Sequence, residues 1–456
     1  MGRRPRPSHA LRPARRRRHA RQGRTPAQGV PLTGGARLVR RRGLPRPRPA
    51  ARHGVPGEVR RGVHDDEGEA HVVTTASHCR GCGSTDLVLV VDLGEQTAAD
   101  YFPPVDTPGE DPRWPLELWL CRVCTLVQLG DVEPALPEVP LAVESATSLA
   151  HSERSVGEIL REHPDLADAP VYEFASHHGG SWLGHLGAAG CRVAGGGEKA
   201  RLVVDVHGLV HHQDLGRSLD ERAERLAPDG LLVCEFHHLL PLVTGTQFDT
   251  IRHGHWTYLS LGAVRALAAA RGLVVVSVRH VALFGGSLQV HLRHTASDPE
   301  VDTTVQEVLD AEAAAGLDDR QRLAALQQAA WSSAAALRRR LVAEKHRGRT
   351  VLGYGAPSKA PVLLDLSEVG PELLAFTVDA APGKHGRRIP GRGVPIRPVD
   401  DLRAARPDVV LLFTWDIADE VIASLEADGG WGAEYLVPLP EPHVVAAPAE
   451  PRPLAG

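Results

Sequence analysis

Lysine is nearly absent from this chain of 456 residues, and long apolar runs are absent altogether. Lysine occurs only at Lys199, Lys345, Lys359 and Lys384, so almost all basic residues are arginine, a bias that fits a GC-rich genome. No apolar run reaches the roughly 20 residues of a transmembrane helix, which argues against a membrane protein. The formal net charge is only −4, so no general attraction to nucleic acid or to a membrane surface is expected.

The first 70 residues lack aromatic side chains and have no acidic residue before Glu58. Arginine and proline dominate this stretch, which cannot bury a core, and we expect disorder over residues 1–72. A twin-arginine or transit peptide is the functional alternative, although no apolar segment follows the arginines. In a third interpretation these residues are not made, and translation starts at Val72 or Val73.

Four of the six cysteines form two CxxC pairs, Cys79-Arg-Gly-Cys82 and Cys121-Arg-Val-Cys124. Without a secretory signal, this pattern indicates metal ligation in a reducing cytosol rather than disulfides. Four thiolates complete a closed tetrahedral zinc site, whose role is in folding rather than catalysis. The alternative is a pair of redox motifs, but those lie in a strand–helix context and no helix pattern is present here.

The stretch 170–190 has the pattern of a first strand–helix unit in a doubly wound α/β fold. Residues 170–174 predict a strand, 175–181 a glycine-containing turn and 182–190 a helix. We expect Glu173 to hold a charged amine, and Ser176 and Gly179 to lie where the turn approaches a nucleotide-like group. Glu198, beyond a second strand at 192–195, would bind ribose hydroxyls. The alternative is a plain strand–helix connection.

A third strand is predicted at 201–206, only a few residues after the second. Parallel neighbours need a crossover of roughly a dozen residues. Either a helix and a strand are missing here, or the two segments are not parallel neighbours. We therefore expect a shortened doubly wound domain.

Two histidines one residue apart, His253 and His255, lie between a predicted strand at 231–236 and a predicted helix at 260–271. Strand ends that open into loops are where α/β proteins place their chemistry. Histidine is the side chain best suited to move a proton near neutral pH. The alternative is a loop with two solvated histidines.

Residues 302–346 predict a helical linker with a break near Gly316, and a second α/β unit begins at 350. Its glycine turn, 353–359, is similar to the glycine-rich motif that binds dinucleotides, but the third glycine of that motif is absent and Pro357 interrupts the turn. We instead expect an anion site, because Lys359 stands at a helix N-terminus. The basic loop around Lys384 would hold phosphates, or is simply solvated.

These pieces together resemble the three-domain C-methyltransferases that act on nucleotide-linked 4-keto-deoxysugars. The resemblance covers roughly residues 79–445. The motifs that carry it are the two CxxC pairs with Asp92-Leu-Gly94; Phe248-Asp-Thr-Ile251 with His253, His255, Tyr258-Leu-Ser260 and Gly285-Gly-Ser-Leu288; and Gly353-Tyr-Gly-Ala-Pro-Ser-Lys359 with Val378-Asp379, Lys384-His-Gly386 and Trp415.

The resemblance implies methyl transfer from S-adenosylmethionine to the sugar carbon beside a ketone, with structural zinc. His255 matches the family's base, and His211 a second active-site histidine. The family usually has Tyr-His-Glu-His where this chain has Arg252-His253-Gly254-His255, and Arg252 would replace the tyrosine as the enolate stabiliser. Tyr354, Lys359 and Lys384 would bind the nucleotide sugar.

The expected fold is α/β, with a small zinc module, a truncated Rossmann-like class I methyltransferase domain, a helical linker and a second Rossmann-like domain. We expect a cytoplasmic monomer or weak dimer that binds a nucleotide sugar but neither nucleic acid nor membrane. The alternative function is a divergent member that binds the sugar without methylating it, as an isomerase or a non-catalytic partner. The expected boundaries are 1–72, 73–140, 141–298, 299–347 and 348–445.

Overall fold

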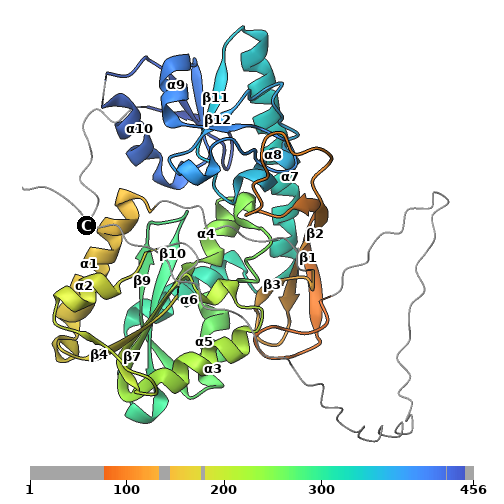
Figure 1. Cartoon of the computed structure of the whole chain (residues 1–456). Coiled ribbons are helices and arrows are strands. Elements are labelled where there is room, and N and C mark those ends of the chain that lie inside the picture. The colour runs from red at the N-terminus through yellow and green to blue at the C-terminus, as the bar shows by residue number, and fades with distance from the viewer. Residues whose placement is uncertain (1–75, 133–143, 176–179, 428, 447–456) are drawn as a thin grey trace, which may run out of the picture. The chain divides into compact units, whose positions relative to one another are not determined.

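A computed structural model of the chain describes residues 76–132, 144–175, 180–427 and 429–446 (Figure 1). Residues 1–72, for which we expected disorder, lie outside this part of the chain. In the described residues the strands form three sheets. None of the helices there is long and apolar enough to cross a membrane.

The first sheet belongs to the cysteine-containing module, and its last strand comes from a distant part of the sequence. The strand order is β1-β2-β3-β8, and neighbouring strands run antiparallel. Alternating apolar residues at 87–93 form the first part of β1. The pairing of β8 with β3 places the stretch around His255 on the module. The bounds are β1 (Leu87–Thr97), β2 (Arg113–Cys121), β3 (Val127–Leu129) and β8 (Thr257–Tyr258).

The central sheet has the order β5-β4-β6-β7-β10-β9. Strands β5, β4, β6 and β7 are parallel, whereas β10 runs antiparallel to both of its neighbours. The bounds are β4 (Pro170–Phe174), β5 (Arg192–Val193), β6 (Ala200–Val206), β7 (Leu226–His237), β9 (Leu273–Val281) and β10 (Ser287–His294).

The short connection between β5 and β6 is explained by the strand order. Both strands pair with β4, one on each side, so they are not neighbours and need no direct crossover. Strand β5 ends the sheet on its side in the described residues. Of the two explanations considered for the short connection, the structure shows the second: the segments are not parallel neighbours. The expectation of a Rossmann-like domain is confirmed.

Helices cover both faces of the central sheet (Figure 1). On one face, α1 and α2 pack against Leu202 and Val204 of β6. On the other face, α3, α5 and α6 pack against Val203, because side chains alternate along a strand. The bounds are α1 (Ala146–Glu162), α2 (Leu183–Ala188), α3 (Leu215–Arg225), α4 (Leu239–Thr244) and α5 (Leu261–Ala269).

The predicted helical linker consists of α6 (Thr303–Ala315) and α7 (Arg320–His346). The break predicted at Gly316 is confirmed, since this residue caps α6 with φ +70°. Helix α7 also packs on the zinc module: the backbone N–H of Asp92 donates to Oε1 of Gln327 over 2.8 Å.

The C-terminal sheet has the order β13-β12-β11-β14-β15-β16 and is parallel except for β16. Its strands are β11 (Val351–Tyr354), β12 (Thr377–Val378), β13 (Ile396–Arg397), β14 (Val409–Leu412), β15 (Glu434–Val437) and β16 (His443–Val445). Its helices are α8 (Ala360–Leu366), α9 (Val399–Ala405) and α10 (Ala418–Glu426).

Candidate active site and zinc module

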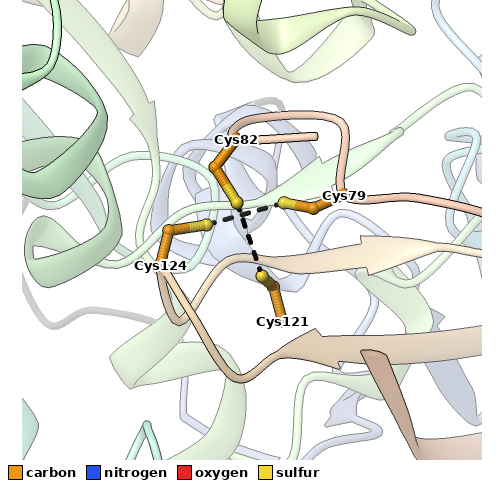
Figure 2. Close-up of side chains that lie close together, drawn as sticks. All are labelled: Cys79, Cys82, Cys121 and Cys124. Carbon is orange, nitrogen blue, oxygen red and sulfur yellow. Dashed lines mark hydrogen bonds between the residues drawn. The ribbon is translucent and has the colours of Figure 1, made fainter. Parts of the chain in front are cut away.

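The four cysteines of the two CxxC pairs converge on one point (Figure 2). Their Sγ atoms all lie within 4.8 Å of one another, with Cys79 and Cys124 3.5 Å apart and Cys82 and Cys121 3.7 Å apart. Zinc–sulfur bonds of about 2.3 Å in a tetrahedron place the sulfur atoms about 3.8 Å apart. The four thiols therefore fit one closed zinc site.

Both CxxC turns have the same backbone geometry. Gly83 follows the first pair with φ +75°, and Thr125 follows the second with φ 60°. The N–H of each donates over 2.9 Å to the carbonyl of the first cysteine of its pair, Cys79 or Cys121. These bonds fold each pair into a tight turn that presents both thiols to the same side.

The stretch around the predicted catalytic histidines is held by the zinc module. Besides the β3–β8 pairing, the N–H of Leu129 donates to the carbonyl of Trp256 over 3.0 Å. The guanidinium of Arg80 stacks 4.4 Å from the centroid of the Trp256 ring. The side chain of His253 bonds through Nε2 to the carbonyl of Pro115 over 3.1 Å. His253 thus faces the module and anchors the stretch there.

Arg252 and His255 lie side by side. The Nη2 group of Arg252 is 2.8 Å from Nε2 of His255, and both residues are buried. Because a guanidinium has donors and no acceptor, Nε2 must carry a lone pair in this arrangement. His255 is therefore in the form that accepts a proton at Nε2, with a cationic donor beside it.

Four imidazole rings, including that of His255, form a continuous row. The ring of His255 lies 4.8 Å from that of His211 and 5.3 Å from that of His237, which lies 4.6 Å from that of His207. The structure thus brings together the predicted pair His255 and His211. Burial lowers the pKa of His237 well below its usual value, so this ring is neutral at physiological pH.

His237 and Glu235 are site residues that our reading of the sequence did not identify. Both lie at the carboxyl end of β7, where an α/β sheet exposes chemistry. Glu235 accepts hydrogen bonds from Nε2 of His151 over 2.9 Å and from the amide of Gln289 over 3.2 Å. Burial raises the pKa of Glu235, but hydrogen bonds from His151 and His207 outweigh it and lower the pKa to about 2.

A cavity opens beside these residues. It lies at the carboxyl ends of β6 and β7, with Gly180 and Trp182 on another side. Two carboxylates, several hydroxyl and imidazole groups and one indole face it. Its lining is Glu144, Ser148, His151, Ser152, Gly180, Trp182, Val206, His207, Glu235, Leu283 and Phe284.

The backbone of His207 is in the left-handed region, with φ 57°, and a buried ion pair supports it. Asp205 accepts from Nε of Arg222 over 2.7 Å and from the N–H of Gly208 over 2.8 Å. A Cβ atom at Gly208 would lie 2.8 Å from Oδ1 of Asp205, so only glycine fits there. The pair thereby fixes the turn that presents His207 to the cavity.

Of the four predicted cofactor residues, Glu173 and Glu198 bond to other side chains or backbone groups of this protein. The other two lie outside the described residues. Glu173 accepts from Oγ of Ser181 over 2.5 Å and from the N–H of Trp182 over 2.6 Å, and so caps the start of α2. Glu198 forms an exposed ion pair with Arg192, which lowers the pKa of Glu198 to about 2. Ser176 and Gly179 lie outside the described residues.

The predicted substrate residues surround the glycine turn of the C-terminal domain. Lys359 forms an ion pair with Asp416 and lies 4.0 Å from the centroid of the Trp415 ring. Lys384 is buried and donates to the carbonyl of Ala356 over 2.9 Å, which fastens the turn. Tyr354 ends β11 and is half-buried, and burial raises its pKa.

Comparisons with known proteins agree with this organisation. Residues 282–440 match the family described as "C-methyltransferase C-terminal domain", and residues 79–136 match "Putative zinc binding domain". The C-methyltransferase NovU of Streptomyces niveus is 31% identical over 417 residues, which cover 82% of this chain and 98% of NovU.

Similar solved structures include two methyltransferases with S-adenosylhomocysteine bound. The 1,6-didemethyltoxoflavin-N1-methyltransferase of Burkholderia thailandensis is 13% identical, with a TM-score of 0.25 over 37% of this chain and 95% of that one. The magnesium protoporphyrin IX methyltransferase of Synechocystis PCC 6803 is 11% identical, with a TM-score of 0.24 over 34% of this chain and 90% of that one. The near full-length match to NovU and the two family matches show that the chain belongs to the C-methyltransferases, as an S-adenosylmethionine-dependent methyltransferase with a zinc-binding module.

Proposed function

We propose that this enzyme methylates the carbon beside the ketone of a nucleotide-linked 4-keto-deoxysugar, with His255 as the base. The observation that carries the proposal is the 2.8 Å separation between Nη2 of Arg252 and Nε2 of His255. Enolisation needs a proton acceptor at the carbon that loses its proton and a donor at the carbonyl oxygen two bonds away. Neighbouring Nε2 and Nη2 atoms suit those two positions.

In the proposed reaction, Nε2 of His255 takes the proton from the carbon, and the electron pair of the broken C–H bond moves to the carbonyl oxygen. Arg252 donates to this oxygen and stabilises its negative charge. S-adenosylmethionine, when bound, would supply the electrophilic methyl group and leave as S-adenosylhomocysteine when the enolate returns to the ketone. The histidine then carries the proton until solvent removes it.

The cavity beside Glu235 is our candidate for the methyl donor site. Its carboxylates suit the positive charges of that cofactor, and Trp182 supplies an apolar wall. The cavity residue His207 contacts His237, whose ring contacts His255, so the cavity and the proposed base are two ring contacts apart.

The C-terminal glycine turn is our candidate for the nucleotide part of the substrate. Lys359 stands before α8, and Tyr354 and Lys384 lie at the same turn. A phosphate would compete with Asp416 for Lys359, because both are anions within reach of one ammonium group. The expected domain boundaries separate this site from the base, so the substrate would bridge the two domains.

The test is a methylation assay on a panel of nucleotide 4-keto-sugars with native protein, His255→Asn and the exposed control His443→Asn. We expect His255→Asn to lower kcat by about 10²- to 10⁴-fold. The control should match the native enzyme. If no 4-keto-sugar is methylated by folded, zinc-loaded protein, the substrate proposal is wrong. If His255→Asn keeps full activity, the assignment of the base is wrong.

A further inference from the structure

Asp100, a residue of the zinc module, reaches into the candidate active site. It lies three positions after the end of β1, and its Oδ2 atom is 2.8 Å from Nη1 of Arg252, 152 residues further along the chain. The side chain of Asp100 is 28% exposed and that of Arg252 only 4%. A buried guanidinium needs a nearby anion to offset its charge. Asp100 supplies that anion.

The guanidinium of Arg252 is held at two corners by different parts of the protein. Nη1 bonds to Asp100, and the neighbouring Nη2 bonds to His255. Because the guanidinium is planar and rigid, holding Nη1 limits the positions that Nη2 can take. The backbone of Arg252 is tied separately, since its N–H donates to the hydroxyl of Tyr258 over 3.0 Å.

We propose that Asp100 is a positioning residue of the reaction, which orients Arg252 toward the developing enolate oxygen. The inference rests on the proposed function of Arg252 and His255. It also gives the zinc module a second role, because the module supplies one corner of the site in addition to its own fold. Asp100 exchanges no proton and touches no reacting atom.

The role follows from what must change when substrate enters. In the structure, Nη2 of Arg252 occupies the lone pair of His255 that must accept the proton. When substrate binds, its carbonyl oxygen has to accept the hydrogen bond that Nη2 now donates to His255. Nε2 of His255 is then able to accept the proton. Asp100 keeps Nη1 in place during this exchange, so the guanidinium pivots over a short distance rather than leaving the site.

The test is a double-mutant cycle with Asp100→Asn and Arg252→Gln, measured as kcat and KM for methylation. Asp100→Asn should lower kcat by about 10- to 100-fold while KM changes little, because a misaligned donor acts on the transition state. In the Arg252→Gln background the same change should alter kcat by less than about 2-fold. Asp100→Glu should restore part of the rate.

Asp106→Asn is the matched control, because Asp106 is an exposed carboxylate of the same module. It should leave kcat unchanged, and all variants should keep one zinc per chain. Equal losses of rate from Asp100→Asn in the native and Arg252→Gln backgrounds would overturn the inference. A loss of zinc or of folded protein in both Asp100→Asn and Asp100→Glu would also overturn it, because the role would then be structural.

Failure of the proposed function is recognised separately. If native protein acts on no 4-keto-sugar, the contact itself is tested by the ¹⁵N resonance of His255 Nε2, assigned by its absence in His255→Gln. Asp100→Asn should shift this resonance, since it releases the donor bonded to Nε2. An unchanged resonance in Asp100→Asn would contradict the positioning role.

Discussion

The indole N–H of Trp415 donates to Oδ2 of Asp249 over 2.8 Å and joins the C-terminal domain to the segment that precedes Arg252. Asp249 is fully buried in a 3₁₀ turn at Phe248–Thr250. On the other side of the indole, a Cβ atom at Gly285 would lie 2.6 Å from the Trp415 ring. The ring is therefore packed between two motifs of the methyltransferase domain.

Asp249 should make stability depend on pH. Burial raises its pKa to about 6, so between pH 4 and 6 the unfolded chain ionises while the folded protein keeps the proton. Stability contributed by this group falls across that window and stays low above it. The difference between this pKa and the usual value for aspartate corresponds to about 3 kcal/mol. Asp249→Asn should be more stable by up to that amount at pH 7.5, as measured by denaturant unfolding.

The advantage of Asp249→Asn should shrink as the pH is lowered from 7 to 5, because the native carboxyl then becomes neutral as well. Asp318→Asn, an exposed position, serves as the control and should track the native protein. A variant that is less stable than native at every pH would show that the carboxylate is favourable where it lies.

Lys359→Met should raise KM for the nucleotide sugar about 10-fold with little change in kcat. The substitution keeps the apolar stem against Trp415 but removes the charge proposed to bind phosphate. Lys345→Met is the control, since Lys345 is exposed and bonds to the carbonyl of Glu372. Steady-state kinetics would contradict the assignment if the two variants behaved alike.

Removal of zinc should abolish activity, although no metal ligand contacts the proposed base. Strand β8 pairs with β3 of the module, and His253 bonds to Pro115, so unfolding of the module releases the stretch that carries His255. Cys121→Ser should therefore lose zinc, measured by metal analysis, together with methylation. Cys191→Ser is the control, because Cys191 lies outside the four-cysteine site. Full activity in zinc-free protein would contradict this coupling.

Glu235→Gln should weaken the binding of S-adenosylmethionine about 10- to 100-fold in calorimetry. The change removes a buried negative charge from the cavity, and the histidines around it lose their anionic partner. Glu158→Gln on the surface of α1 should bind like the native protein. Unchanged affinity in Glu235→Gln would place the cofactor elsewhere.

Much of the architecture follows from local patterns. Strand β4 has the bounds that the sequence predicts, and Gly316 ends α6, as expected of a residue that readily adopts a positive φ. The zinc site follows as well, because the spacing within each cysteine pair almost dictates its geometry. These features depend on residues close together in the chain.

Features that depend on distant pairing could not be predicted in this way. The contact of Asp100 with Arg252 spans 152 residues, and nothing local to Asp100 distinguishes it from a surface acid. Glu173 lies at a strand end, where cofactor ligands are common, yet its carboxylate accepts a hydrogen bond from the N–H of Trp182. The four-histidine row needs the strand order, since His207 and His237 become neighbours only when β6 pairs with β7.

The addition of β8 to the zinc module has a consequence for how this protein emerges from the ribosome. The partner of β3 is synthesised about 130 residues after β3 itself, a delay on the order of ten seconds at normal rates of translation. Until then β3 is an open strand edge, to which another nascent chain can add. We expect misassembly to be most frequent in ribosome-bound chains that end between β3 and β8. A chaperone that covers the unpaired edge of β3 would have its largest effect on these chains.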